Sequence, residues 1–235
     1  MSEFKYEGDE LSLFQHASNW KAYFGKLIEP YLGASVLEVG AGNGATTQAL
    51  ISDAQISWTC LEPDPSLAAA IQERIRQNEL PPRCRVIASP VDSLSHSEHF
   101  DSILYIDVLE HIDQDCAELE SAFRHLNVGG HLIVLSPAHQ YLYSPFDASI
   151  GHVRRYNKTR LSESAPRGMK LVRMEYLDSV GALASLANKI LLRQGYPTLK
   201  QILFWDRWLV RASKIVDPLF AGRAGKSILG IWQKS

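Results

Sequence analysis

Residues 36–47 have the sequence Val36-Leu37-Glu38-Val39-Gly40-Ala41-Gly42-Asn43-Gly44-Ala45-Thr46-Thr47. A short run of strand character over 35–38 leads into three glycines at alternate positions, and residues 45–51 have helix character. Glycine tolerates positive φ angles and has no Cβ, so such a strand-to-helix turn lets a ligand approach the backbone closely. The stretch predicts a nucleotide-type binding loop, and the alternative is an ordinary connection between a strand and a helix.

The acidic residue and the glycine spacing distinguish this turn from a dinucleotide-binding loop. Glu38 lies two residues before the first glycine, and the spacing is Gly-x-Gly-x-Gly instead of Gly-x-Gly-x-x-Gly. A carboxylate here would repel a pyrophosphate but suits a cationic amino group. The pattern resembles motif I of the class I S-adenosylmethionine (SAM) methyltransferases. The resemblance implies that Glu38, Gly40, Ala41, Gly42 and Gly44 hold the methionine end of SAM, with Glu38 acting directly or through water.

Length and composition fit one globular domain. The chain has 235 residues and 46% hydrophobic content, and we expect a single domain over 1–235 with an N-terminal helical cap over 1–33 and a helical insertion over 179–224. A net charge of −2 gives no attraction to nucleic acid. The three cysteines are widely spaced, which predicts buried thiols in a reducing compartment. Neither a leader segment nor a membrane-length apolar run is apparent, so we expect a cytoplasmic protein.

Two further acidic residues follow strand-like segments. Glu62 ends the predicted strand 56–61, about twenty residues beyond the first glycine, where a carboxylate can accept hydrogen bonds from both ribose hydroxyls; Pro63 follows it. Asp92 follows the predicted strand 83–89 and resembles the family's adenine-binding position, with the backbone N–H of Ser93 beside it. An Asp-Ser pair is also typical of a helix cap or a turn.

The next segments define the fold class. The apolar strand 100–107 ends at Asp107, a further cofactor-binding candidate, and Leu109-Glu110-His111 resembles the corresponding segment of small-molecule SAM methyltransferases. Nucleic-acid base methylases usually carry Asn/Asp-Pro-Pro-aromatic at this point, so we expect no nucleic-acid partner.

Strands and helices alternate up to strand 131–136, and strands over 169–176 and 226–234 follow. We predict an α/β fold with a doubly wound, mostly parallel seven-stranded sheet, Rossmann-like, whose last strand is antiparallel and preceded by the helical insertion.

Residues 137–156 leave the sheet at its ligand-binding edge and are rich in histidine, arginine and aromatic residues. The segment resembles a subgroup of bacterial SAM methyltransferases with Leu-Tyr-Ser-x-Phe-Asp-x-x-x-Gly-His-x-Arg-Arg-Tyr. His152 is the candidate general base for an acceptor hydroxyl, because an imidazole titrates near neutrality, and His111 is a weaker candidate.

The same segment supplies the candidate acceptor-binding residues. Arg154 and Arg155 offer planar guanidinium groups for a carboxylate or phosphate, and Tyr143 and Tyr156 flank them. The alternative is structural: Asp147 pairs with one of the arginines and braces the loop, while the histidine of the segment only caps it.

These patterns predict a SAM-dependent methyltransferase that acts on a small-molecule or glycan acceptor, at oxygen in preference to nitrogen or carbon, and releases S-adenosylhomocysteine (SAH). We expect metal-independent transfer, because no metal ligands cluster at short spacing. The alternatives are a C- or N-methyltransferase of a lipid-like or aromatic acceptor, a non-catalytic SAM-binding subunit and, disfavoured by the loop, an NAD(P)-dependent dehydrogenase.

The predicted helices of the insertion, over 180–194 and 199–220, have three interpretations. They cover the active site, they form a dimer contact, or their basic amphipathic surface docks on a membrane and reaches an anionic or lipid-linked acceptor. A monomer and a homodimer are both compatible with the sequence.

Overall fold

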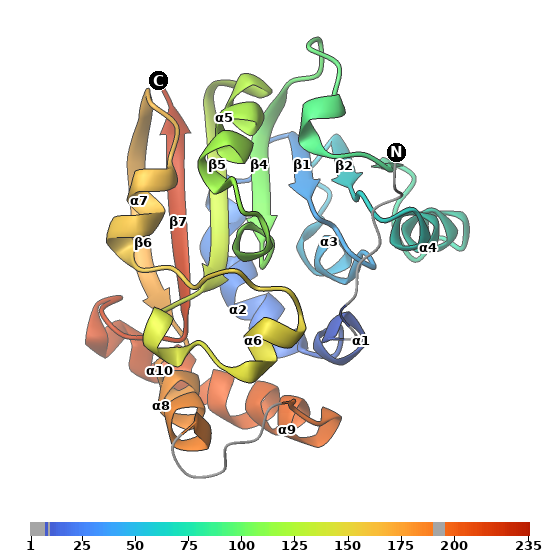
Figure 1. Cartoon of the computed structure of the whole chain (residues 1–235). Coiled ribbons are helices and arrows are strands. Elements are labelled where there is room, and N and C mark those ends of the chain that lie inside the picture. Colours follow the sequence, from blue (N-terminus) through green and yellow to red (C-terminus); the bar gives the residue numbers. More distant parts are fainter. Residues whose placement is uncertain (1–7, 9, 190–195) are drawn as a thin grey trace.

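The computed structural model describes residue 8, residues 10–189 and residues 196–235, and its centre is a seven-stranded sheet (Figure 1). The strand order is β3-β2-β1-β4-β5-β7-β6; β1 to β5 run parallel, and β7 is antiparallel to both β5 and β6. This topology confirms the predicted fold, including the direction of the last strand. The strands are β1 (Ser35–Val39), β2 (Ser57–Leu61), β3 (Cys84–Ile87), β4 (Phe100–Ile106), β5 (Leu126–Pro137), β6 (Met169–Leu177) and β7 (Ser227–Lys234).

The core lies on both faces of the sheet. Successive side chains of a strand point to opposite faces. Val36 of β1 and Leu104 of β4 accordingly pack with Phe24 on one face, whereas Leu37 and Ile103 lie on the other, and all five are buried. Coverage on both faces explains why the central strands are continuously apolar, as expected for parallel strands.

Short helices connect the strands and bring the loops to the edge where the parallel strands end. The helix after the glycine turn, α3, begins at Ala45 as predicted. The connecting helices and 3₁₀ turns are α3 (Ala45–Leu50), α4 (Pro65–Arg76), η2 (Val91–Ser93), η3 (Leu109–His111), α5 (Asp115–Arg124), η4 (Gln140–Leu142), α6 (Pro145–Ser149) and α7 (Lys158–Ser164).

The described part of the expected N-terminal helical cap over 1–33 is divided into three short elements. It comprises α1 (Glu10–Phe14), α2 (Ser18–Ile28) and the 3₁₀ turn η1 (Glu29–Tyr31). The residue at the N-cap position of α2 makes no side-chain cap. Instead, the carboxylate of Asp206 accepts hydrogen bonds from the backbone N–H groups of Asn19 (3.1 Å) and Trp20 (2.8 Å). A residue of the insertion therefore caps α2 across 187 positions of the chain.

The insertion packs against α2 at the end of the sheet where β1 to β5 finish (Figure 1). Its described elements are α8 (Ser179–Ala187), α9 (Leu199–Phe204), the π-helix η6 (Trp205–Leu209), α10 (Val210–Val216) and the 3₁₀ turn η7 (Asp217–Phe220). Residues 190–194 of the predicted helix 180–194 lie outside the described residues. Among the helices that the structure describes, none is both long and apolar enough to cross a membrane.

A second carboxylate fastens the insertion to α2. Asp217 accepts hydrogen bonds from the Tyr23 hydroxyl of α2 (2.8 Å) and from the backbone N–H groups of Asp178 (2.7 Å) and Ser179 (3.0 Å) at the start of α8. The two aspartates thus fix the insertion over the carboxyl ends of the parallel strands.

The cysteines follow the prediction only in part. Cys60 and Cys84 are buried, but Cys116 is exposed near the start of α5. The prediction of three buried thiols is wrong at Cys116.

Candidate active site

The glycine turn between β1 and α3 has the conformation that its sequence predicts. Gly40, Gly42 and Gly44 have φ angles of 65°, 57° and 76°, a region that other residues rarely adopt. A Cβ built on Gly40 would lie 2.6 Å from Cγ2 of Val108. Leu11 of α1 covers the turn, because a Cβ on Gly42 would lie 3.4 Å from its Cδ2 atom. The turn therefore requires glycine for both its backbone conformation and its close packing.

Glu62 lies against the glycine turn. Its Oε2 accepts a hydrogen bond from the backbone N–H of Gly42 (2.7 Å), and its Oε1 accepts one from the N–H of Asp64 (3.0 Å). Burial raises the pKa of Glu62, and the two backbone N–H groups oppose that rise. Glu62, followed by the partly buried Pro63, thus ties the end of β2 to the turn, and its assignment to the ribose stays a prediction.

Glu38 is buried below the turn. Its Oε2 accepts hydrogen bonds from the Thr47 hydroxyl (2.6 Å) and from the Trp58 indole N–H (2.9 Å). Burial raises the pKa of Glu38 to about 7, although these two hydrogen bonds act in the opposite direction. Glu38 is not among the described residues that line the two pockets considered below. Its contacts join β1, α3 and β2, and its assignment to the methionine end of SAM stays a prediction.

Asp92 and Ser93 lie in the turn η2, against α5. The Asp92 carboxylate accepts a hydrogen bond from the Ser121 hydroxyl and lies 3.5 Å from Nη2 of Arg124. The Asp92 side chain is 73% exposed, and within the described chain neither Asp92 nor Ser93 lines either pocket. Their geometry gives no support to the adenine assignment.

A cavity of about 930 Å³ lies above the glycine turn, and residues of the insertion form part of its wall. Its wall includes Gly40, Ala41 and Gly42 of the turn, Asp107 at the end of β4, and residues of α1, α2, the 140–155 segment and the insertion. The apolar part of the wall consists largely of Phe14, Trp20, Phe24, Leu142, Phe146, Ile150, Ile202 and Trp205. The volume lies near the upper end of the range for small-molecule sites.

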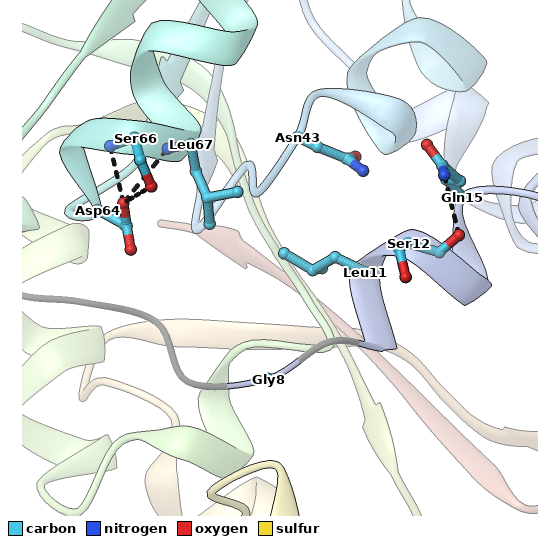
Figure 2. A pocket seen from close by; sticks show the side chains of 8 residues that line it. All are labelled: Gly8, Leu11, Ser12, Gln15, Asn43, Asp64, Ser66 and Leu67. Atoms are coloured by element: carbon cyan, nitrogen blue, oxygen red, sulfur yellow. Dashed lines mark hydrogen bonds between the residues drawn. The ribbon is translucent and has the colours of Figure 1, made fainter.

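A smaller pocket of about 270 Å³ adjoins this cavity at the turn (Figure 2). It shares Leu11, Gln15 and Asn43 with the large cavity. Figure 2 shows the Asn43 side chain between Leu67 on one side and Gln15 on the other. The two hollows therefore meet over the glycine turn.

Asp107 is a carboxylate that opens into the large cavity. It follows β4 with a φ angle of 54°, and its N–H donates to the carbonyl of Leu135 (2.8 Å). Desolvation by the surrounding protein raises the pKa of Asp107 to about 6, while the nearby His152, Lys226, Lys21 and Arg155 act in the opposite direction. The cavity thus holds one carboxylate at the end of the central strand.

His152 lies in the same cavity and is oriented by a buried carboxylate. Its Nδ1 lies 2.9 Å from Oδ1 of Asp147. The Asp147 carboxylate also accepts two hydrogen bonds from Arg155, one from Nε to Oδ1 (2.8 Å) and one from Nη2 to Oδ2 (3.0 Å). Burial alone would raise the pKa of Asp147, but the hydrogen bonds from His152 and Arg155 hold it below its usual range. Nε2 of His152 lies 3.8 Å from Oε1 of Glu110, and its ring packs edge-on against that of His111.

The other predicted acceptor residues lie outside the cavity wall. Arg154 pairs with Asp115 (Nη1 to Oδ2, 2.9 Å) and donates to two backbone carbonyls of the loop 112–113. Tyr156 is fully buried and donates to the same aspartate (2.8 Å), and the Tyr143 hydroxyl donates to the carbonyl of His152 (2.6 Å). Of the four predicted acceptor residues, Arg155 alone lines the cavity, and Asp147 binds it as the structural alternative anticipated.

Two cavity residues had no recognisable signal in the sequence. Lys21 of α2 is buried and donates to the carbonyl of Phe14 (2.6 Å). Lys226 precedes β7, with Nζ 3.6 Å from Oδ2 of Asp178 and 3.7 Å from the ring centre of Trp205. Isolated lysines resemble surface residues in a single sequence, so only the assembled fold identifies them as part of the cavity.

The comparisons with known proteins agree with this architecture. The family model of a methyltransferase domain matches residues 37–132, and no curated protein matches the chain. The [4+2]-cyclase SpnF is similar in structure, with a TM-score of 0.62 and 17% identity over 91% of this chain and 81% of that one. Coclaurine N-methyltransferase, bound to N-methylheliamine and SAH, is similar with a TM-score of 0.62 and 16% identity over 99% of this chain and 76% of that one.

A third similar structure is the N-methyltransferase NodS from Bradyrhizobium japonicum WM9, with a TM-score of 0.56 and 15% identity over 96% of this chain and 98% of that one. At identities of 15 to 17%, these structural similarities show the fold alone. The match to the methyltransferase-domain model spans the glycine turn and the strands around it. The chain therefore has the fold of these proteins, and its residues 37–132 match the methyltransferase-domain family.

Proposed function

We propose that the protein transfers the methyl group of SAM to a hydroxyl oxygen of a small-molecule or glycan acceptor held in the large cavity. The observation that supports this proposal is the continuity of the cavity, whose wall includes both the glycine turn and the imidazole of His152. Methyl transfer requires the nucleophile and the sulfonium to lie in line, and holding both in one cavity supplies much of the rate.

The cofactor half of the site comprises the turn and the hollow beside it. The methionine end of SAM would lie against Gly40, Ala41 and Gly42, where missing side chains give access to the backbone. Asp107 is the exposed one of the carboxylates in the described cavity wall, so it replaces Glu38 in our proposal as the partner of the cofactor's ammonium group. The adenosine would extend past Glu62 into the smaller pocket.

The acceptor half combines an oriented imidazole with apolar walls. Because Nδ1 of His152 is held by Asp147, its Nε2 faces the cavity and is available to act on an acceptor hydroxyl. The aromatic side chains around it suit the apolar part of an aromatic or lipid-like acceptor. Arg155 would position the loop through Asp147 instead of binding an anion directly.

The test is transfer of an isotope-labelled methyl group from SAM to a panel of phenols, sugars and lipid-linked glycans, each paired with its amine analogue. We expect product methylated at oxygen, identified by mass spectrometry, and a loss of kcat in His152→Ala with the Kd for SAH unchanged. His16→Ala, which alters an exposed histidine, is the matched control. Product methylated only at nitrogen or carbon would contradict the proposal.

A further inference from the structure

Three potential metal ligands lie together in the wall of the large cavity. Glu110 and His111 belong to the turn η3 after β4, and His152 comes from the segment after β5. One ligand atom from each lies within 4.8 Å of the other two. His152 lies about forty positions after Glu110 and His111 in the chain. The sequence therefore shows no cluster of metal ligands at short spacing.

Glu110 is a buried carboxylate without a close hydrogen bond in the described part of the chain. Its side chain is fully buried, and neither carboxylate oxygen makes a close hydrogen bond to a described residue, although the Ser136 hydroxyl and Nε2 of His152 lie nearby. An ionised carboxylate without a partner is costly in the protein interior. The nearby cations are engaged elsewhere: Arg155 binds Asp147, and Lys226 lies beside Asp178. Among the described residues, therefore, no lysine or arginine forms an ion pair with Glu110.

The two histidines are held as metal-binding histidines usually are. Metal-bound imidazoles commonly donate their other ring N–H to a carboxylate or a backbone carbonyl. Asp147 occupies that position for His152, and a backbone hydrogen bond with Gly151 does so for His111. The ring centres lie 4.6 Å apart at an angle of 80°, and one nitrogen of each ring lies within 4.8 Å of the other.

We propose that Glu110, His111 and His152 bind one divalent cation of the kind that accepts mixed nitrogen and oxygen ligands, such as Zn²⁺, Mn²⁺ or Fe²⁺. The 3.8 Å between Nε2 of His152 and Oε1 of Glu110 fits two ligands of one ion, because ligand atoms at about 2.1 Å from a metal lie roughly 3 to 4 Å apart. With only three protein ligands, positions on the ion stay open toward the cavity.

This inference rests on the proposed function and changes the role of His152 there from general base to metal ligand. The ion would bind the acceptor hydroxyl and lower its pKa, so that the proton passes to solvent. An electron pair of the resulting oxyanion then forms the O–C bond, while the pair of the S–C bond goes to sulfur and leaves neutral SAH. The substrate class is an acceptor whose hydroxyl can reach the ion, including catechol-like and sugar diols that occupy two open positions.

The experiment measures metal binding without any acceptor. Purified protein is stripped with a chelator and titrated with Co²⁺, whose visible absorption reports nitrogen and oxygen ligands, and Zn²⁺ is then added in competition. We expect one ion per chain, at least about a 100-fold weaker affinity in Glu110→Gln and His152→Ala, and about a 10- to 100-fold weaker affinity in Asp147→Asn. His16→Ala should bind Co²⁺ as the wild type does.

Two results would overturn the site: no Co²⁺ absorption in the wild type, or absorption that survives in folded Glu110→Gln. If Glu110→Gln does not fold, His111→Ala, at a half-buried position, provides the same test. A parallel titration with SAH separates the two proposals. SAH binding without Co²⁺ binding rejects the metal site alone, whereas Co²⁺ binding without SAH binding rejects the proposed function.

Discussion

The replacement Glu38→Gln tests whether the acidic residue of the glycine motif is a structural element of the core. Glu38 is buried, and its Oε2 accepts hydrogen bonds from Thr47 and Trp58. A glutamine carbonyl can accept both hydrogen bonds, so the variant keeps these contacts and removes only the ionisable group.

The magnitude follows from the pKa of Glu38, which burial raises from 4.5 to about 7 in the folded protein. Below pH 4.5 Glu38 is protonated in both the folded and the unfolded protein, and its ionisation does not change the free energy of unfolding. Between these values the unfolded chain ionises while the folded one stays protonated, so the folded state becomes less stable as pH rises. At about 1.4 kcal/mol per pKa unit, the wild type should lose roughly 2 to 3 kcal/mol relative to Glu38→Gln between pH 5 and pH 8.5.

The assay is urea denaturation of both proteins at several pH values in this range. Asp53→Asn, at a fully exposed position, controls for the loss of one negative charge. A difference in the free energy of unfolding that stays constant within about 0.5 kcal/mol from pH 5 to pH 8.5 would refute the reasoning. The Kd for SAH, measured in parallel, should change little, because Glu38 does not line the cavity.

Three further replacements test other parts of the account. Gly40→Ala should weaken SAH binding at least about tenfold in a calorimetric titration, because the added Cβ would crowd Val108 at a positive φ angle. Gly129→Ala is the control, because Gly129 also has a positive φ angle but has open space where the Cβ would lie. This control should bind SAH as the wild type does. Asp206→Ala should destabilise the protein by about 2 kcal/mol and lower its Tm by roughly 4 to 8 °C, since α2 loses its cap; an unchanged Tm in calorimetry would contradict this role. Arg154→Ala should lower the Tm but leave KM for the acceptor unchanged in steady-state kinetics, and a raised KM would restore the predicted acceptor role.

The elements of the fold could be predicted because local patterns encode them. The glycine turn, the apolar central strands and the alternation of strands and helices depend on residues that are close in sequence. The break between α1 and α2 could not be predicted, because the cap that starts α2 comes from Asp206 in the insertion.

The site was predictable only where a motif defines the backbone. The turn at Gly40 to Gly44 is present, but the direction of individual side chains was not accessible. Arg154 and Arg155 are adjacent in an extended segment, and side chains there point to opposite sides; one reaches Asp115, and the other lies in the cavity against Asp147. The grouping of Glu110 with His152 depends on tertiary structure and has no signal in spacing.

The most direct test of the central claim is a calorimetric titration of the purified protein with SAM, SAH and NAD in parallel. The account predicts that SAM and SAH each bind at one site per chain, and that NAD does not bind. Binding of NAD without SAH, or binding of none of the three, would contradict a methyl-transfer site built over the glycine turn.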